Sequence, residues 1–169
     1  MKLVPATPED AEAVASLRTR AATHLALSHG PGPWAREVSG KDVLDRMSKG
    51  KVFLVPHHQG LIATLGLTTT KPRAIDVSNF RAVRLPIYLV DMAVDPEHQG
   101  RGIGRWCLGE VEGLVRSWSG EAVRLDAYEG QAGASGFYRR CGYREVGRAV
   151  FRQVPLVYFE SILGISSSP

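Results

Sequence analysis

Two spacings of hydrophobic residues divide the chain into short strands and amphipathic helices. Seven short segments carry the alternating or branched apolar residues that are typical of β-strands. These segments cover residues 3–7, 51–55, 61–69, 87–94, 122–128, 144–151 and 154–160. In four other segments the apolar residues recur every three or four positions, as on one face of a helix. The helices are expected over residues 8–27, 41–49, 103–118 and 133–141.

Local signals at the segment ends agree with this pattern. Thr7 followed by Pro8 and Asp10 is a typical helix start, because it supplies a cap, a suitable first residue and an acid at the positive end. Gly50 and Gly142 follow predicted helices, where a glycine often ends the helix. Because short turns separate the second strand from the third and the sixth from the seventh, both pairs are predicted to be antiparallel.

A strand, a glycine-rich loop and a helix follow one another at the centre of the chain. The strand at 87–94 is rich in branched and aromatic residues, and the helix presents a face of Ile103, Cys107, Val111 and Val115. Because the next strand comes after this helix, the two strands should be parallel and joined by a right-handed connection. With no repeat or linker visible, residues 1–169 are predicted to form one α/β domain.

Composition excludes several classes of protein. Hydrophobic residues make up 44% and charged residues 22% of the chain, close to globular averages, and no apolar run reaches the roughly 20 residues of a membrane helix. The two cysteines, Cys107 and Cys141, lack the spacing of a zinc site or a disulfide framework. We therefore expect a cytoplasmic protein without export signal, metal or membrane anchor. The net charge of +4 is mild, and no motif for nucleic-acid binding is present.

The sequence DPEHQGRGIGRW at residues 95–106 raises the question of an anion site. Backbone N–H groups at a helix start lack internal partners, and glycines with positive φ can turn such groups inward to bind phosphate. Arg101 and Arg105 would add charge-assisted contacts to a pyrophosphate. The spacing does not match the dinucleotide fingerprint, and no triphosphatase loop occurs in the chain. An ordinary strand-to-helix turn is the alternative.

The sequence MAVDPEHQGRGIG resembles the signature of the GNAT superfamily of acetyl-coenzyme A dependent N-acetyltransferases. That loop reads Q/R-x-x-G-x-G/A, and here it is formed by Gln99, Gly102 and Gly104. A second element of the family, N-x-x-A-x-x-x-Y followed by G-F or G-Y, is matched by Ala134, Tyr138 and the pair Gly142-Tyr143. Gln131 replaces the asparagine of this element. The two elements cover residues 85–143, about a third of the chain.

The resemblance implies a fold, a cofactor and a set of contacts. The fold would be a mixed, strongly twisted sheet of about six or seven strands flanked by about four helices, and the cofactor would be acetyl-CoA. A bulge in the strand would free the N–H of Met92 for the thioester carbonyl, and Val94 would bond the pantetheine arm. The full set of expected cofactor contacts is Met92, Ala93, Val94, Gln99, Gly100, Arg101, Gly102, Ile103, Gly104, Arg105, Gln131, Ala134 and Tyr138.

The resemblance also places two catalytic residues. Tyr138 would be the general acid for the thiolate, because a phenol with a pKa near 10 stays protonated at neutral pH. Asp91 would be the base that takes the proton of the amine, although an ion-paired or orienting role is the alternative. Tyr88 is a second candidate, either lining the acceptor pocket or passing a proton through water. Trp34 would wall that pocket or simply pack, and none of the histidines His29, His57, His58 and His98 has a partner at a telling spacing.

The prediction is therefore an N-acetyltransferase that moves an acetyl group from acetyl-CoA to a primary amine by direct attack in a ternary complex. A small-molecule amine is favoured over a protein amino group as the acceptor, and the closing hairpin offers apolar surface for a homodimer. A non-catalytic acyl-CoA sensor with the same loop is the alternative, and neither a nucleic acid nor a membrane is expected as a partner.

Overall fold

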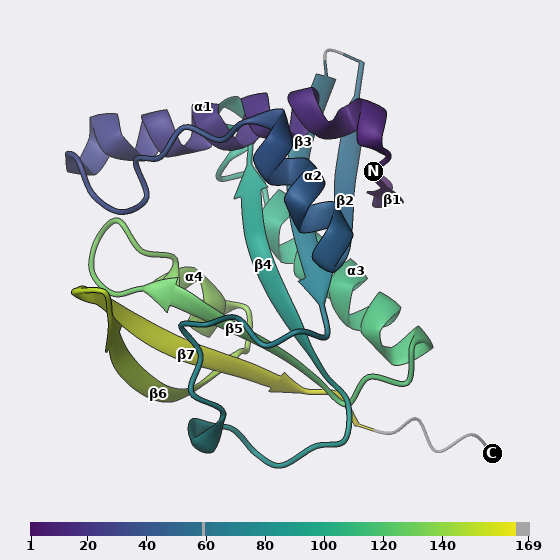
Figure 1. Cartoon of the computed structure of the whole chain (residues 1–169), viewed down its shortest axis with the longest axis vertical. Helices are drawn as coiled ribbons and strands as arrows, with labels where there is room; N and C mark the ends of the chain where they lie inside the picture. The colour runs from purple at the N-terminus through teal and green to yellow at the C-terminus, as the bar shows by residue number, and fades with distance from the viewer. Residues whose placement is uncertain (59, 165–169) are drawn as a thin grey trace. The chain divides into compact units, whose positions relative to one another are not determined.

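The computed structural model describes residues 1–58 and 60–164 of the 169-residue chain (Figure 1). Within these residues it has seven strands and four α-helices, as the sequence predicts. The strands are β1 (Val4–Pro5), β2 (Lys51–His57), β3 (Gly60–Thr68), β4 (Pro86–Val94), β5 (Ala122–Tyr128), β6 (Arg144–Phe151) and β7 (Val154–Ile162). The α-helices are α1 (Ala11–His29), α2 (Gly40–Lys49), α3 (Ile103–Ser117) and α4 (Ser135–Arg140), with 3-10 turns η1 (Pro8–Asp10), η2 (Val77–Asn79) and η3 (Pro96–His98).

The strand order is β1-β2-β3-β4-β5-β7-β6. The pair formed by β4 and β5 is parallel, as expected for the two strands joined through α3, and its register runs from Pro86–Ala122 to Tyr88–Arg124. The pairs β1–β2, β2–β3, β5–β7 and β6–β7 are antiparallel. The mixed α/β fold class is therefore confirmed.

The described chain divides into two compact units. Unit 1 contains Met1–Thr68 and Leu89–Cys107, and unit 2 contains Thr69–Tyr88 and Leu108–Pro169. The division falls inside β4 and inside α3, so each of these elements contributes residues to both units. Each unit has a hydrophobic core of its own.

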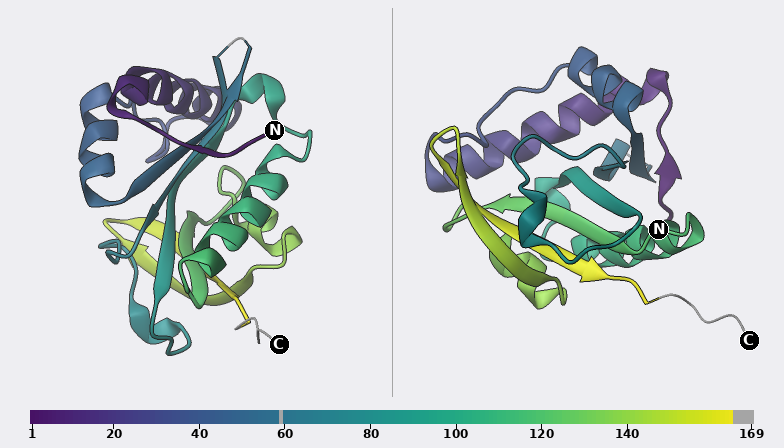
Figure 2. Two further views of the ribbon diagram at one scale, coloured as in Figure 1. Left: turned by 90° about the vertical axis from the view of Figure 1, so that its right-hand side faces the viewer. Right: turned by 60° about the horizontal axis from the view of Figure 1, so that its bottom comes forward.

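The core of unit 1 lies between its helices and strands. Ala11, Val14 and Ala15 of α1 pack with Val43 of α2 and with two β2 residues, Val52 and Leu54. Figure 2 shows α1 and α2 on one face of β2 and β3. α2 begins at a capping box formed by Ser39 with Asp42, and the 3-10 turn η1 that leads into α1 begins at a capping box formed by Thr7 with Asp10. These caps satisfy N–H groups that the first helical turn leaves without partners.

The core of unit 2 contains an aromatic cluster. Tyr88 is 3% exposed and packs with Ile75, Phe80, Leu156 and Tyr158. Burial in this cluster favours a packing role for Tyr88 over the suggested place in an acceptor pocket. The sequence does not reveal this burial, since the burial of a strand residue depends on partners that lie far away in the sequence.

An ion pair is also buried in unit 2. Arg124 of β5 and Glu160 of β7 lie opposite one another, and Arg124 Nε donates to Glu160 Oε2 at 2.9 Å. The guanidinium also stacks on Phe80 at 4.8 Å from the ring centre and donates to the carbonyl of Arg81. The alternation of β5 predicts Val123, Leu125 and Ala127 as the buried positions, and the structure buries Arg124 as well because Glu160 balances its charge.

The hairpin of β6 and β7 closes at Arg152 and Gln153. Both residues have positive φ, 49° and 66°, although neither is a glycine. Two successive residues of this conformation suit the twist of a two-residue hairpin turn. In the part of the chain that the structure describes, no helix is long and apolar enough to cross a lipid bilayer.

Candidate active site

The glycine loop, residues 99–102, connects η3 to α3. Gly100 and Gly102 have φ values of +74° and +79°, which only glycine adopts without strain. Nothing lies within 4 Å of the positions where their Cβ atoms would be, so conformation rather than crowding requires glycine here. The expectation that the first glycines take positive φ is confirmed.

The first turn of α3 follows the loop directly. The carbonyl of Gly102 accepts a hydrogen bond from the N–H of Trp106 at 3.0 Å, which makes Gly102 the residue that opens the helix. The N–H groups of residues 103–105 precede this first helical bond, and such groups have no partner inside the helix. Arg101 and Arg105 are exposed beside them, whereas the side chain of Ile103 is buried. The loop therefore offers N–H groups and positive charge to an anion.

Hydrogen bonds hold the glycine loop to the end of β4. Gln99 Nε2 donates to the carbonyl of Val94 at 3.1 Å, and the N–H of Gln99 donates to Pro96. Asp95 caps η3, because its Oδ1 accepts from the N–H of Glu97 at 3.0 Å. The N–H of Asp95 itself donates to Ile62 of β3 at 2.9 Å, so the start of the loop is tied to the sheet.

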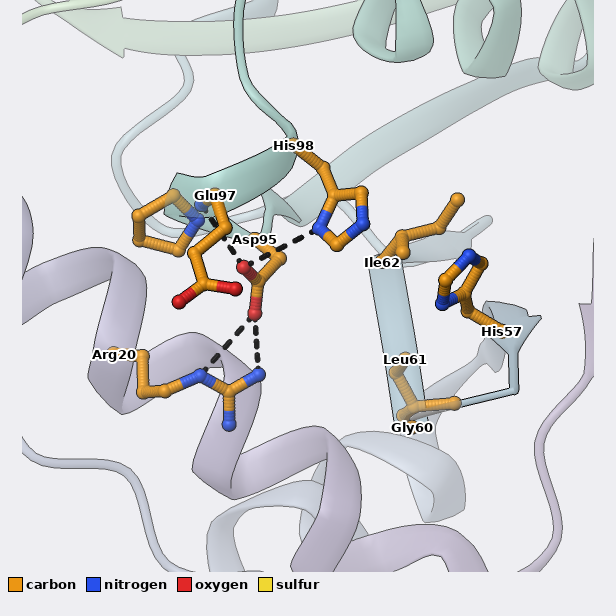
Figure 3. A pocket seen from close by; sticks show the side chains of 9 residues that line it. Arg20, His57, Gly60, Leu61, Ile62, Asp95, Glu97 and His98 are labelled. Carbon is orange, nitrogen blue, oxygen red and sulfur yellow. Dashed lines mark hydrogen bonds and ion pairs between the residues drawn. The ribbon is translucent and has the colours of Figure 1, made fainter.

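The carboxylate of Asp95 is also bonded to α1. Arg20 places Nε at 3.2 Å and one terminal nitrogen at 2.5 Å from Asp95 Oδ2, and His98 Nδ1 lies 3.6 Å from Oδ1 (Figure 3). Burial raises the pKa of the Asp95 carboxyl, but hydrogen bonds from Arg20 and from the N–H of Glu97 outweigh it and leave the pKa below its usual value. The carboxylate is thus a charged anchor for the base of the loop.

A cavity of about 350 Å³ lies beside this anchor. Its lining residues are Arg20, His57, Gly60, Leu61, Ile62, Asp95, Pro96, Glu97 and His98, all of unit 1 (Figure 3). The rings of His57 and His98 meet edge to face at 5.3 Å, and His57 also contacts His58. Burial, together with these two imidazoles, lowers the pKa of His57. His57 therefore has both His58 and His98 as neighbours in space, although no spacing in the sequence joins it to His98.

The second half of β4 contains a kink, formed by Val90, Asp91 and Met92. Asp91 has a φ of 55°, which costs a non-glycine residue roughly 1–2 kcal/mol and persists only where the surroundings impose it. The positive φ of Asp91 agrees with the bulge that the resemblance implies for this strand. The side chain of Asp91 accepts from Arg18 of α1 at 2.8 Å through Oδ1 and from Arg46 of α2 at 2.7 Å through Oδ2. This geometry favours the ion-paired alternative for Asp91 over the role of a base.

The exposure of β4 changes along its length. Ile87, Tyr88 and Leu89 are buried, whereas all five residues from Val90 to Val94 are half-buried, with no alternation between the two faces. The register of β4 with β5 covers Pro86–Tyr88 only, and the half-buried residues lie beyond it. The half of β4 that does not pair with β5 is called its open half. It contains the predicted cofactor contacts on this strand, Met92, Ala93 and Val94.

Tyr138 lies in the short helix α4 of unit 2. Its ring is buried against Phe137, Tyr143 and Phe159, with ring centres 5.2 to 5.9 Å away. Burial raises the pKa of the Tyr138 phenol well above its usual value, and the neighbouring Asp126 and Cys141 raise it further. Gly142, with a φ of +90°, ends the helix as predicted. Tyr138 is therefore held in one place and keeps its proton.

Gln131 and Ala134 precede this helix. Both are exposed, and the carbonyl of Ala134 accepts from the N–H of Tyr138 at 3.1 Å, so Ala134 helps to start α4. A Cβ atom on Gly133 would lie 1.7 Å from the carbonyl oxygen of Tyr128, which explains the glycine at this position. Unit 1 thus contains the predicted site residues from Asp91 to Arg105, and unit 2 contains Gln131, Ala134 and Tyr138.

Sequence reasoning missed three residues of unit 1. Arg18 and Arg46 bond Asp91 across 73 and 45 positions of the chain, and Arg20 bonds Asp95 across 75. No local signal distinguishes these arginines from those of a solvated helix face.

Trp34, a candidate wall of the acceptor pocket, folds over its own loop. Its ring covers Gly32, and its Nε1 donates to the carbonyl of Gly30 at 3.3 Å.

The chain belongs to the acetyltransferase (GNAT) family, whose sequence description matches residues 23–143. Family membership confirms the predicted enzyme class and cofactor: the protein is an acyltransferase that depends on acetyl-CoA. A search of curated proteins found no match.

Solved structures share the fold. Ribosomal-protein-S18-alanine N-acetyltransferase from Escherichia coli aligns with a TM-score of 0.72 and 15% identity over 98% of this chain and 96% of that one. Ribosomal-protein-alanine N-acetyltransferase from Brucella melitensis aligns with a TM-score of 0.71 and 19% identity over 96% of this chain and 100% of that one. The yncA protein from Salmonella typhimurium, solved with its cofactor acetyl-CoA, aligns with a TM-score of 0.67 and 16% identity over 99% of this chain and 96% of that one. The predicted GNAT fold is confirmed.

Proposed function

We propose that this protein is an N-acetyltransferase that moves an acetyl group from acetyl-CoA to a primary amine by direct attack in a ternary complex. The observation that carries the proposal is the glycine loop, in which Gly100 and Gly102 adopt positive φ directly before α3 in a chain of the acetyltransferase family. A small-molecule amine is the favoured acceptor. A protein α-amino group is the second choice, because two structural neighbours are named for acetylating a ribosomal protein.

The residues of unit 1 fit the cofactor. Two glycines with positive φ and the N–H groups at the start of α3 suit a pyrophosphate, and Arg101 and Arg105 bring positive charge to the same place. When bound, acetyl-CoA supplies the activated acetyl group as a thioester. Val94, at the open end of β4, is the proposed backbone partner of the pantetheine arm.

The N–H of Met92 is the proposed donor to the carbonyl oxygen that gains charge during transfer. It follows the kink at Asp91, where the strand leaves its regular path. A fixed donor aimed at a developing oxyanion contributes about 3 kcal/mol in related acyl transfer. Because such a donor acts only when it is held in place, the conformation of residues 90–92 matters as much as their identity.

Tyr138 is the proposed general acid. Its phenol lies in a buried aromatic environment that raises its pKa, so the Oη atom holds a proton throughout the neutral and mildly alkaline range. A donor that never ionises in the working range is suited to protonate a departing thiolate, whose unperturbed pKa is about 8.5.

We assign no base to the incoming amine. Each oxygen of Asp91 already accepts a charge-assisted hydrogen bond from an arginine, so Asp91 is proposed as an ion-paired residue that supports the strand. An alkyl amine with a pKa near 10.4 is neutral to only about one part in 2,500 at pH 7. The rate at limiting amine should therefore rise about tenfold per pH unit until the amine itself is deprotonated.

The experiment is a thiol-release screen with acetyl-CoA. Small amines, amino acids, lysine peptides and peptides with a free N-terminal alanine form the panel, and mass spectrometry identifies the acetylated product. Calorimetric titration of acetyl-CoA is run on the same protein. Binding with turnover of one amine class supports the proposal, whereas binding without turnover across the panel favours an acyl-CoA sensor. No binding to well-folded protein contradicts both.

A further inference from the structure

We propose that Arg18 and Arg46 are positioning residues that hold the kink of β4 through Asp91, and so aim the N–H of Met92 at the acetyl group. The side chains of Arg18, Arg46 and Asp91 are together called the arginine clamp. This inference rests on the proposed function, because it gives the N–H of Met92 the role described above.

The backbone at Asp91 requires an outside restraint. Its φ of 55° lies in a region that strand residues with side chains avoid, and Asp91 is not at a turn but inside β4. Residues held in such conformations persist where the surrounding structure over-determines them, and they cluster at functional sites. Contacts from the surrounding structure must therefore hold the backbone of Asp91 at positive φ.

The clamp supplies this restraint from two directions. Arg18 comes from α1 and binds Oδ1 at 2.8 Å, while Arg46 comes from α2 and binds Oδ2 at 2.7 Å. The side chains of Asp91 and Arg18 are only 25% and 20% exposed, so water screens this pair less than a surface pair. Because each oxygen has its own arginine, the carboxylate is held in direction, and a return of residue 91 to regular strand geometry would strain both bonds.

The neighbouring strand makes room for the kink. Gly66 of β3 lies where a Cβ atom would come within 2.9 Å of a Val90 methyl group and 3.4 Å of the Val90 carbonyl oxygen. The same Cβ would lie 3.6 Å from Cδ of Arg46. A side chain at position 66 would therefore push on both the kink and the stem of one clamp arginine.

Met92 follows the restrained residue directly. Any rotation of the backbone at Asp91 turns the peptide plane between residues 91 and 92, which carries the N–H of Met92. Loss of the clamp should therefore loosen this N–H without touching the glycine loop, which has its own anchors at Asp95 and Gln99. The two parts of the site can thus be separated by experiment.

The first test compares affinity for acetyl-CoA with affinity for CoA by calorimetry. Arg18→Met and Arg46→Met keep the aliphatic stems and remove the charges. We expect each to lower the preference for acetyl-CoA over CoA at least threefold, while CoA affinity stays within twofold of the wild type. An unchanged preference in both variants, with folded protein confirmed by thermal unfolding, would overturn the inference.

The second test uses Asp91→Gly as a background. Glycine adopts positive φ without a restraint, so the kink should survive in this variant without the clamp. We expect Arg46→Met to have no further effect on the acetyl-CoA preference when it is added to Asp91→Gly. An equal loss in both backgrounds would show that Arg46 does not act through Asp91, and would refute the clamp.

The third test needs no cofactor. Hydrogen exchange measured by mass spectrometry on a peptide containing residues 89–94 should be about tenfold faster in Arg18→Met and Arg46→Met than in the wild type. Exchange that stays unchanged in both variants counts against the clamp. If the wild type binds neither CoA nor acetyl-CoA, the proposed function fails, and this measurement alone still decides whether the arginines restrain β4.

Discussion

The glycine loop and the kink of β4 both contain left-handed backbone, but they differ in how the chain reaches it. In the loop, Gly100 and Gly102 adopt positive φ freely because they have no side chain. In the kink, Asp91 adopts it with a side chain whose carboxylate is bonded to Arg18 and Arg46. The loop is thus specified by its own residues, and the kink depends on two helices.

This difference decides what can be broken by a single substitution. A change inside the loop acts at the site of the change. A change that affects the kink can be made on α1 or α2, far from β4 in the sequence. The predictions below concern Gly102 of the loop, the proposed acid Tyr138, the anchor Asp95 and finally Gly100.

The largest effect is expected for Gly102→Glu. A side chain at a φ of +79° is strained, and a carboxylate would repel the phosphates that the loop is proposed to bind. Affinity for acetyl-CoA should fall more than about a hundredfold, which corresponds to about 2.7 kcal/mol. Gly109→Glu on the exposed face of α3 is the matched control, and equal losses in both variants would show that charge alone is responsible.

Tyr138→Phe separates chemistry from binding. Turnover should fall about a hundredfold, the usual contribution of a positioned acid, while the dissociation constant of acetyl-CoA stays within about twofold. Tyr143→Phe is the control, because the Tyr143 hydroxyl is buried and has no hydrogen-bond partner among the described residues. Because burial raises the pKa of Tyr138, its ionisation should not limit the rate below pH 10. Full activity of Tyr138→Phe would remove the acid from the mechanism.

Asp95→Asn weakens the base of the loop. Loss of the charged partner of Arg20 should lower the free energy of unfolding by about 1–3 kcal/mol at pH 7, measured by urea denaturation. Since the pKa of Asp95 is lowered on folding, its contribution is present above about pH 4 and is lost as pH falls through the folded-state value. The variant and the wild type should therefore converge in acid. Asp45→Asn, at an exposed pair with Lys49, should change stability by no more than about 0.5 kcal/mol.

The smallest effect is expected for Gly100→Ala. Alanine at a φ of +74° should cost about 1–2 kcal/mol of stability, with a smaller loss of cofactor affinity than Gly102→Glu. Gly109→Ala, inside α3 with open space around it, should stabilise the protein by about 0.5–1 kcal/mol. Thermal unfolding of the two variants gives the comparison. Shifts of the same sign would show that φ is not the reason for glycine at position 100.

The same contrast explains how much the sequence reveals. The helix starts, the ends at Gly50 and Gly142, and the positive φ of the loop glycines were all predictable, because each depends on a few neighbouring residues. The burial of Tyr88, the two arginines that pair with Asp91 and the ion pair of Asp95 were not. Their partners lie tens of residues away, and a single sequence contains no signal that joins them. The acid assigned to Tyr138 and the cofactor contacts remain predictions from the family resemblance.

The buried pair of Arg124 and Glu160 also limits which replacements the two positions tolerate. Replacing either residue alone would strand an unbalanced charge between two strands, a change that costs several kcal/mol in comparable interiors. Apolar side chains of similar volume at both positions would be far better tolerated, as paired replacements at such sites often are. Accepted substitutions are therefore expected to change Arg124 and Glu160 together. Mutant libraries of this enzyme should vary the two positions as a pair.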